Sequence, residues 1–241
     1  PCKATKVNGG RTRNMPSDAP EKWEVYKKYN RRDVEVEVAI RRIVTADCNP
    51  VTPLERKLYI ADQHINDRGV EIDKTLALNA IKMDEVYKGR LNAECQQITG
   101  LDNPNSPSQL KTWLGEKTGQ TIARLTKEDY PKMMASADGD VKRVLTIRTE
   151  MAKTSTAKYV SMRDALCNDG RIHGTLQFYG SRTGRWAGRI VQVQNLPQNH
   201  IDDLNFARNL LLGGDLGLME TCYGNVPDTL SQLIRTAFVA K

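Results

Sequence analysis

The sequence lacks the long apolar runs and paired cysteines that mark membrane, secreted and zinc-binding proteins. No apolar run approaches the ~20 residues that a membrane-spanning helix needs, and no charged stretch followed by an apolar one stands at the start as a secretory signal would. No CxxC pair occurs, which argues against a disulfide framework and favours free thiols in a reducing compartment. The cysteines are scattered: Cys2, Cys48, Cys95, Cys167 and Cys222. These absences predict a cytoplasmic protein with no membrane partner.

Metal and nucleotide signatures are also missing. His64, His173 and His200 are far apart, and no cysteine or carboxylate clusters with them at the spacing of zinc ligands. The GGDLG segment at 213–217 lacks the GxxxxGK[ST] pattern of a phosphate-binding loop. The composition, with 39% apolar and 27% charged residues among 241, is nevertheless that of a folded protein able to bury a core.

The positive charge is concentrated in one quarter of the chain. Residues 141–200 hold ten lysines and arginines against three acids, and this balance of +7 equals the net charge of the whole chain. Such a localised field suits a polyanion, because each phosphate that is neutralised releases condensed counterions. A solvated basic face without a ligand is the alternative that charge alone leaves open.

Hydrophobic spacing predicts an α+β fold that is mainly α. The expected helical segments are 17–44 (one or two helices), 54–69, 73–100, 106–115, a short helix within 126–140, 140–170, parts of 200–224, and 226 onward. After Gly170 the period changes to that of strands, in 171–180 and again in 189–196. We therefore expect long, projecting helices beside a small antiparallel β region, with Gln192 and Gln194 on one side of a strand.

The helical stretch 140–170 has an unusual distribution of charge. Its basic residues at 143, 148, 153, 158 and 163 are five apart, so at ~100° per residue they wind around the helix axis. Two interpretations follow. Either the helix projects from the body and is exposed on several sides, or it bends near residues 154–156.

The segment GSRTGRWAGRIVQVQNLPQN, residues 180–199, contains no acid at all. Its arginines are forked donors that stay charged, its glycines allow close approach of the backbone, and its amides suit base edges. In the minor groove such donors grip DNA while reading little sequence, because A·T and T·A present similar acceptors there. A polar edge hairpin with exposed arginines is the alternative.

The order of residues in this segment resembles the thumb-to-palm region of family A (Pol I-like) DNA polymerases. The residues themselves especially resemble those of phage members. That family carries Thr-Gly-Arg followed by Leu-Gln-Asn-Ile-Pro, which stand here as 183–185 and 193–197. LDNPNSPSQLKTWL, residues 101–114, and IRTEMAKTSTAKYVSMRDAL, residues 147–166, resemble successive thumb segments.

The resemblance implies contacts with primer-template DNA. It maps the minor-groove arginine at the primer end onto Arg185, and it maps contacts with the template strand or minor groove onto Gln192, Gln194 and Asn195. It maps contacts with the DNA backbone onto Lys153, Lys158 and Tyr159, with Ser155 and Thr156 as further donors. The remaining candidates for DNA contact are Arg182, Thr183 and Arg189. Gln192 stands where many members have Asn, while Trp186 and Arg189 replace the small residues of cellular relatives.

A second motif, YNRRD at 29–33, resembles the last motif of the family's 3′–5′ exonuclease domain. The resemblance implies that Asp33 binds a catalytic metal ion and that Tyr29 orients the attacking water. A spacing of four residues brings both side chains to one face of a helix, as this role requires. By itself the pattern is common in amphipathic helices, so its place upstream of the polymerase-like segment carries the assignment.

The resemblance implies three parts: the end of an exonuclease-like domain (1–48), a helical thumb (49–170) and the beginning of a polymerase palm (171–241). It implies DNA and dNTPs as partners and two Mg²⁺ ions, with most metal ligands expected before Pro1 and beyond Lys241. The chain alone is therefore expected to be inactive, and the sequence leaves its oligomeric state open. The alternatives are a stand-alone, non-catalytic nucleic-acid-binding module and a structural protein with a basic face.

Overall fold

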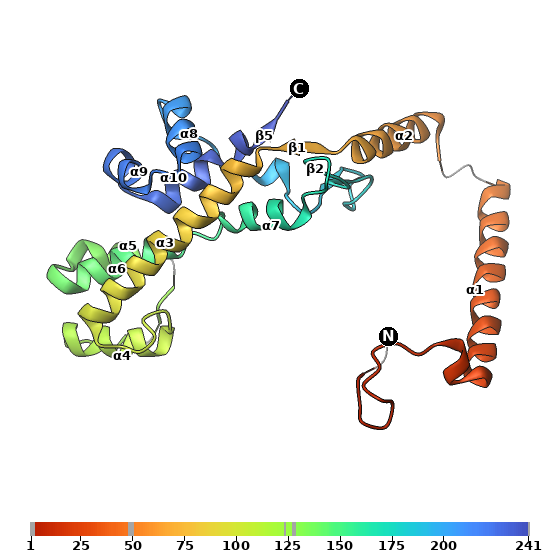
Figure 1. The fold of residues 1–241 in the computed structure, drawn as a ribbon, viewed down its shortest axis with the longest axis horizontal. Helices are drawn as coiled ribbons and strands as arrows, with labels where there is room; N and C mark the ends of the chain where they lie inside the picture. Colours follow the sequence, from red (N-terminus) through yellow and green to blue (C-terminus); the bar gives the residue numbers. More distant parts are fainter. Residues whose placement is uncertain (1–2, 48–50, 123, 127–128, 241) are drawn as a thin grey trace. The chain divides into compact units, whose positions relative to one another are not determined.

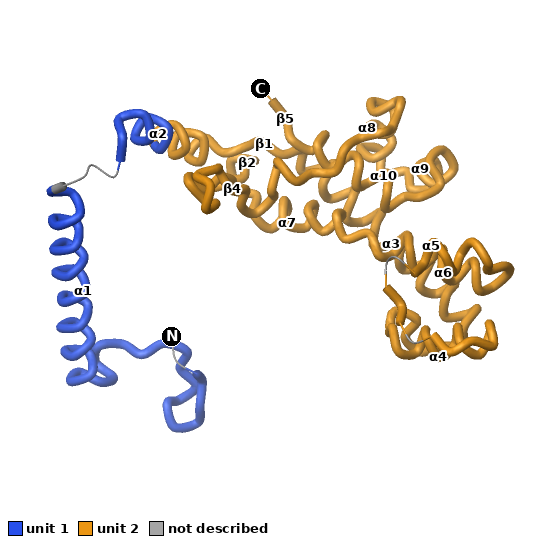
Figure 2. Tube along the Cα trace, turned by 180° about the vertical axis from the view of Figure 1, so that it is seen from behind, with its two compact units in different colours: residues 1–59 blue, residues 60–241 orange. Residues whose placement is uncertain are grey.

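The computed structural model describes residues 3–47, 51–122, 124–126 and 129–240, which form two compact units, 1–59 and 60–241 (Figure 2). Of the cysteines, Cys2 and Cys48 lie outside the described residues, whereas Cys95 is a buried free thiol and Cys167 and Cys222 are exposed ones. The division at 48 and 170 inferred from the resemblance stays a prediction.

The first unit is built around one long helix, α1 (Pro20–Asp47), which follows the short 3₁₀ turn η1 (Pro16–Asp18). Pro20 suits the first helical position, because its fixed φ is helical and its missing N–H would have no partner there. The side chains of residues 20–46 are all exposed. The segment expected to form one or two helices is therefore a single helix that contributes nothing to a core.

The boundary between the units falls within α2 (Pro53–Arg68). A capping box begins this helix: the backbone N–H of Glu55 donates to Thr52 Oγ1 at 3.1 Å, and that of Thr52 donates to Glu55 Oε2 at 2.9 Å. The helix stops where the sequence predicts, at Gly69, whose φ of 66° is left-handed and suits a glycine.

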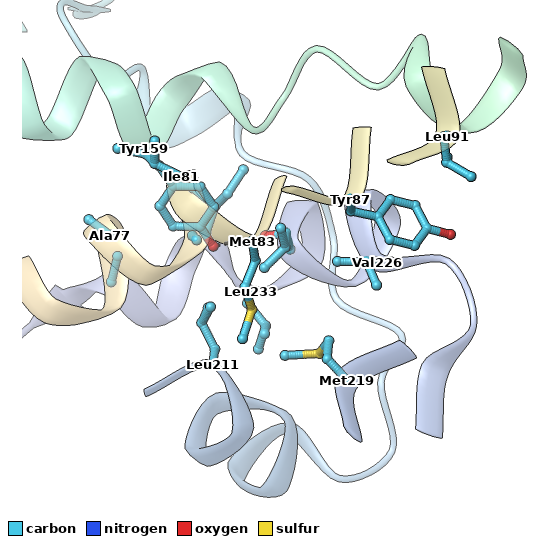
Figure 3. Packing of buried hydrophobic residues seen from close by; sticks show 14 of the residues in the cluster. Ala77, Ile81, Met83, Tyr87, Leu91, Tyr159, Leu211, Met219, Val226 and Leu233 are labelled. Atoms are coloured by element: carbon cyan, nitrogen blue, oxygen red, sulfur yellow. Dashed lines mark hydrogen bonds between the residues drawn. The ribbon is translucent and has the colours of Figure 1, made fainter. Parts of the chain in front are cut away.

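The second unit is organised around α3 (Lys74–Thr99), which begins at the expected cap, since Asp73 accepts a hydrogen bond from the backbone N–H of Leu76. It contacts α6 (Gly139–Met151), α7 (Ala157–Ala165), α8 (Leu204–Gly213) and α10 (Val226–Leu233) (Figure 1). Figure 3 shows its apolar side chains gathered with Tyr159 of α7 and with Leu211, Met219, Val226 and Leu233 from the C-terminal helices. A helix with partners on several sides is the core of this unit.

Among the remaining helices, the three C-terminal ones begin at side chains that cap them. α4 (Pro107–Thr118) follows Ser106, and α5 (Asp129–Ser136) packs on α6. Asp203, Asp215 and Asn225 accept hydrogen bonds from the third backbone N–H of α8, α9 (Leu216–Tyr223) and α10. These helices lie within the segments that the hydrophobic spacing predicts, except that α4 continues three residues past its expected end at 115.

The stretch 140–170 is two helices, α6 and α7, separated at 152–156. The bend expected near 154–156 is therefore confirmed, and the alternative of one projecting helix is wrong. The reason is burial: Val144, Leu145 and Ile147 of α6 and Met162 of α7 are 0% exposed. The apolar side chains between the basic positions bind both helices to the core.

Two small antiparallel sheets complete the fold. In the first, β1 (Val70–Ile72) lies between β2 (Arg171–Ile172) and β5 (Phe238–Val239), which follows the 3₁₀ turn η3 (Ile234–Ala237). In the second, β3 (Leu176–Gln177) pairs with β4 (Ala187–Gly188), with Leu176 opposite Gly188 and Gln177 opposite Ala187. The predicted fold class, α+β and mainly α, is confirmed.

The strand expected over 189–196 is wrong. Ile190 has a φ of 61°, which no strand residue adopts, and η2 (Val193–Asn195) is a 3₁₀ turn closed by the hydrogen bond from Asn195 N–H to the Gln192 carbonyl. The buried side chains of this segment are Val191 and Leu196, five residues apart, a spacing that does not fit the period of two. Gln192 and Gln194 therefore do not share the face of a strand.

Within the described ranges, no helix combines the length and the apolar character that crossing a membrane requires.

Candidate nucleic-acid interface

The polar segment forms the turn between β3 and β4 and the chain that follows it. Ser181 closes the turn: its backbone N–H donates to the Arg185 carbonyl at 3.2 Å, and its Oγ accepts from the Arg185 N–H at 3.0 Å. Its Oγ also lies 3.1 Å from Thr183 Oγ1. The tip that carries Arg182 and Thr183 is therefore exposed and yet closed by its own hydrogen bonds.

The glycines of this segment serve the internal packing of the hairpin. A Cβ on Gly184, whose φ is 76°, would lie 2.9 Å from Cζ of the Tyr179 ring. A Cβ on Gly180 would collide with the Cβ of Ala187, and one on Gly188 would lie 2.5 Å from Gln194 Oε1. The close approach inferred from the sequence is thus an approach of the chain to itself.

The arginines of the hairpin have different environments. Arg182 and Arg185 are exposed, and neither guanidinium has a hydrogen-bond or ion-pair partner among the residues that the structure describes. Arg189 donates through Nε and Nη2 to Oε1 of Gln177, at 3.0 and 2.7 Å. Two guanidinium groups are therefore available to a ligand, while the third is held across the hairpin.

The turn η2 brings several candidates together. Asn195 Nδ2 donates to Gln192 Oε1 at 2.7 Å, and the side chain of Gln194 lies over Gly188 of β4. Lys158 of α7 donates to the Asn195 carbonyl at 3.1 Å. The structure thus places Lys158, which the sequence separates from this segment, beside the amides.

The segment between α6 and α7 is bound to the rest of the unit. Lys153 Nζ lies 2.5 Å from Asp228 Oδ1, Ser155 Oγ donates to Ser231 Oγ at 2.6 Å, and Thr156 Oγ1 donates to Asp84 Oδ2 at 3.0 Å. Burial opposes ionisation of Asp228, but hydrogen bonds from Lys153 and Gln232 outweigh it and lower the pKa of that carboxyl. The lysine charge is accordingly matched by an acid within the protein.

Tyr159 does not reach the surface. Its side chain is 0% exposed, its hydroxyl donates to the Leu230 carbonyl at 2.8 Å, and burial raises its pKa. A contact between this tyrosine and the DNA backbone is incompatible with that position. We therefore leave Tyr159 out of the interface, where sequence reasoning had included it.

Tyr29 and Asp33 both lie on α1 in the first unit, four residues apart and exposed. In the described part of the chain, no group of three or more histidine, cysteine, aspartate or glutamate side chains could hold a metal ion. Among the described residues, Asp33 therefore belongs to no group of three or more ligands of the kind that a metal centre needs.

Sequence reasoning missed one residue of this region, Asp62 of α2, which is only 2% exposed. Its Oδ1 accepts a hydrogen bond from Trp186 Nε1 at 2.7 Å. One signal could have found it: Asp62 lies four residues after Leu58 and three before Ile65, so the carboxylate falls in the apolar stripe of a predicted helix.

The chain is similar in sequence to known DNA polymerases. The DNA polymerase of Bacillus phage SP02 is 56% identical over 243 aligned residues, which cover 99% of this chain and 37% of that protein. The chain is homologous to a DNA polymerase. DNA polymerase I of Streptococcus pneumoniae is 28% identical over 153 residues (60% of the chain and 17% of that protein). DNA polymerase I of Caldicellulosiruptor bescii is 27% identical over 156 residues (60% and 18%).

The chain thus spans 37% of the length of its phage relative and less than a fifth of the length of the bacterial ones. No family model matches it.

Proposed function

We propose that this chain is the primer-template-binding portion of a DNA-directed DNA polymerase. One observation carries the proposal: in a chain 56% identical to a phage DNA polymerase, Arg182 and Arg185 are exposed on a hairpin and have no partner within the described residues. A guanidinium group that is matched by no acid is set to bind an anion or a base edge.

In this proposal the hairpin lies against the minor groove of the primed duplex. Arg185 donates to the O2 and N3 acceptors of the groove, and Arg182 and Thr183 at the tip contact phosphate. The geometry supports this assignment, because the hydrogen bonds of Ser181 fix the tip without using either guanidinium. The hairpin therefore binds without ordering a loop.

Gln192, Asn195 and Lys158 extend the surface. The bond between Asn195 Nδ2 and Gln192 Oε1 holds the two amides against each other, and the Gln192 Nε2 and Asn195 Oδ1 groups remain to face the bases. Lys158 donates to a carbonyl rather than to a carboxylate, so its charge is not neutralised and it can meet a phosphate. Arg189 and Gln194 contribute by holding the hairpin.

Among the residues that the structure describes, no group of three or more histidine, cysteine, aspartate or glutamate side chains fits the two-metal centre on which nucleotidyl transfer depends. Polymerases of this kind need paired carboxylates that hold two Mg²⁺ ions, and the resemblance maps no such pair onto these residues. Tyr29 and Asp33 are proposed to complete an exonuclease site together with other carboxylates, and we derive no catalytic step from them. We expect the chain by itself to show neither primer extension nor exonuclease turnover.

The test is the affinity of the chain for a primer-template duplex, measured by fluorescence anisotropy at low salt. Arg185→Ala should weaken binding by about tenfold, as expected for the loss of one groove contact worth ~1–3 kcal/mol. Arg163→Ala is the matched control, because Arg163 carries the same charge on α7 but pairs with Asp164 at 2.8 Å. Equal effects of the two substitutions would contradict the proposed position of the hairpin.

A further inference from the structure

A buried carboxylate and an amide on α2 bind the hairpin at its base. Asp62 Oδ1 accepts from Trp186 Nε1 at 2.7 Å, and Asp62 Oδ2 accepts from Gln63 Nε2 and Asn66 Nδ2, both at 3.1 Å. Trp186 directly follows Arg185 and packs edge-on against Phe178, with ring centroids 5.5 Å apart. A single acid thus fixes the ring beside the arginine.

Asn66 bonds both the backbone donor and the backbone acceptor of Leu176 in the first strand of the hairpin. Its Nδ2 donates to the Leu176 carbonyl at 3.0 Å, and its Oδ1 accepts from the Leu176 N–H at 3.0 Å. This is the pairing that a neighbouring strand would supply to an edge residue. Since Nδ2 also donates to Asp62, the carboxylate orients the amide, and the two residues form one unit.

The negative charge of Asp62 is unfavourable both for burial and for a position near DNA. A carboxylate repels a polyanion, and a buried one loses its hydration unless hydrogen bonds replace it. No cation pairs with Asp62 in the described residues; its three hydrogen bonds all come from neutral donors. The charge of Asp62 alone would weaken DNA binding. Its hydrogen bonds therefore point to a different role, which is to hold the hairpin in position.

We propose that Asp62 and Asn66 are positioning residues, which hold the hairpin and so set the orientation of Arg185 toward the duplex. The claim that these residues orient Arg185 toward DNA rests on the proposed function. The claim that α2 holds Trp186 and Leu176 in place can be measured without DNA.

The experiment compares Asp62→Ala with Asp67→Ala in the full chain. Both remove one negative charge from α2, but the side chain of Asp67 is exposed. On charge alone both variants should bind the primed duplex more tightly. We expect Asp62→Ala to bind about tenfold more weakly and Asp67→Ala to bind no more weakly than the wild type, since one lost positioning contact is worth about one decade in Kd.

Two further readouts separate positioning from general stability. Hydrogen exchange of the Trp186 indole N–H, assigned by its loss in Trp186→Phe, should be about tenfold faster in Asp62→Ala. The effect of Asp62→Ala on affinity should vanish in an Arg185→Ala background, because a residue that acts through Arg185 is non-additive with it. If Asp62→Ala does not fold, Trp186→Phe takes its place in the same double-mutant cycle. It keeps an aromatic side chain but removes the indole donor, and backbone exchange at Leu176 is then the structural readout.

Unchanged exchange at the probed group, or additive effects with Arg185→Ala, would overturn the inference. If the wild-type chain fails to bind the duplex, the proposed function fails. Exchange then decides alone: faster exchange supports the fixing of the hairpin by α2, and unchanged exchange overturns it.

Discussion

Lys153 and Lys158 show how two residues of the same type acquire different tasks. Both are basic positions between α6 and the end of α7, and the resemblance to the polymerase family implies the same contact with the DNA backbone for both. In the structure Lys153 lies 2.5 Å from an Asp228 oxygen, whereas Lys158 donates to the Asn195 carbonyl. Only the second lysine keeps its charge unmatched by an acid.

This difference predicts unequal salt dependence. Lys158→Ala should lower the slope of log Kd against log salt by about one, because one phosphate is no longer neutralised. Lys153→Ala should change it less, since a phosphate would first have to displace Asp228. The slopes come from anisotropy titrations of a primed duplex between roughly 50 and 200 mM salt. A larger change for Lys153 than for Lys158 would show that the ion pair with Asp228 opens on DNA.

At the scale of elements, the sequence predicts what depends on periodicity and caps and misses what depends on contacts between distant segments. Asp73 and Gly69 mark helix ends because capping is local chemistry. The alternation over 189–196 misleads, because the φ of Ile190 and the turn at η2 arise from how Val191 and Leu196 are buried.

In the candidate site, too, local features were predictable from the sequence, and contacts between distant residues were not. The exposed arginines were predictable, since no acid is close to them in the sequence. The contact of Asp62 with Trp186 was not, because it joins residues 124 positions apart. Nor was the burial of Tyr159, which depends on the Leu230 carbonyl of α10.

His173 joins two elements in a way that depends on pH. Its Nε2 lies 2.9 Å from Asp169 Oδ2, and its Nδ1 lies 2.9 Å from the Asp67 carbonyl at the end of α2. The hydrogen bond with Asp169 raises the pKa of the imidazole and lowers that of the Asp169 carboxyl. A raised folded-state pKa means that this contribution to stability is fully present below the unfolded-state value of ~6.5 and is lost as pH rises through the folded-state value.

His173→Gln should therefore remove a pH dependence of stability. In the wild type the free energy of unfolding should fall as pH rises from about 6 to 8, on account of this group. In the variant that part of the slope should be absent. Urea unfolding of the two proteins at several pH values measures it, and parallel slopes in wild type and variant would show that the pair with Asp169 contributes nothing.

At the scale of the whole molecule, charge and core belong to the second unit. The segment 141–200, with its balance of +7, lies within residues 60–241. Every described side chain that is buried lies at or after Asp62, and residues 20–46 of α1 bury none. The second unit thus has its own core and the proposed DNA-binding surface.

These two facts predict that residues 51–241 are sufficient for folding and duplex binding. This shortened chain keeps the Thr52–Glu55 capping box, α2 with Asp62, and the complete buried cluster. It should unfold cooperatively at the same midpoint as residues 1–241, as measured by thermal denaturation. It should also bind the primed duplex, and Arg185→Ala should weaken that binding as much as in residues 1–241.

A deletion at the other end, which leaves residues 1–225, is the control. It loses α10 with Val226, Leu230 and Leu233, each worth about 1.5–3 kcal/mol when buried, and should not unfold cooperatively. If residues 51–241 failed to fold while 1–241 folded, α1 would be supplying stability that the burial of its side chains does not account for.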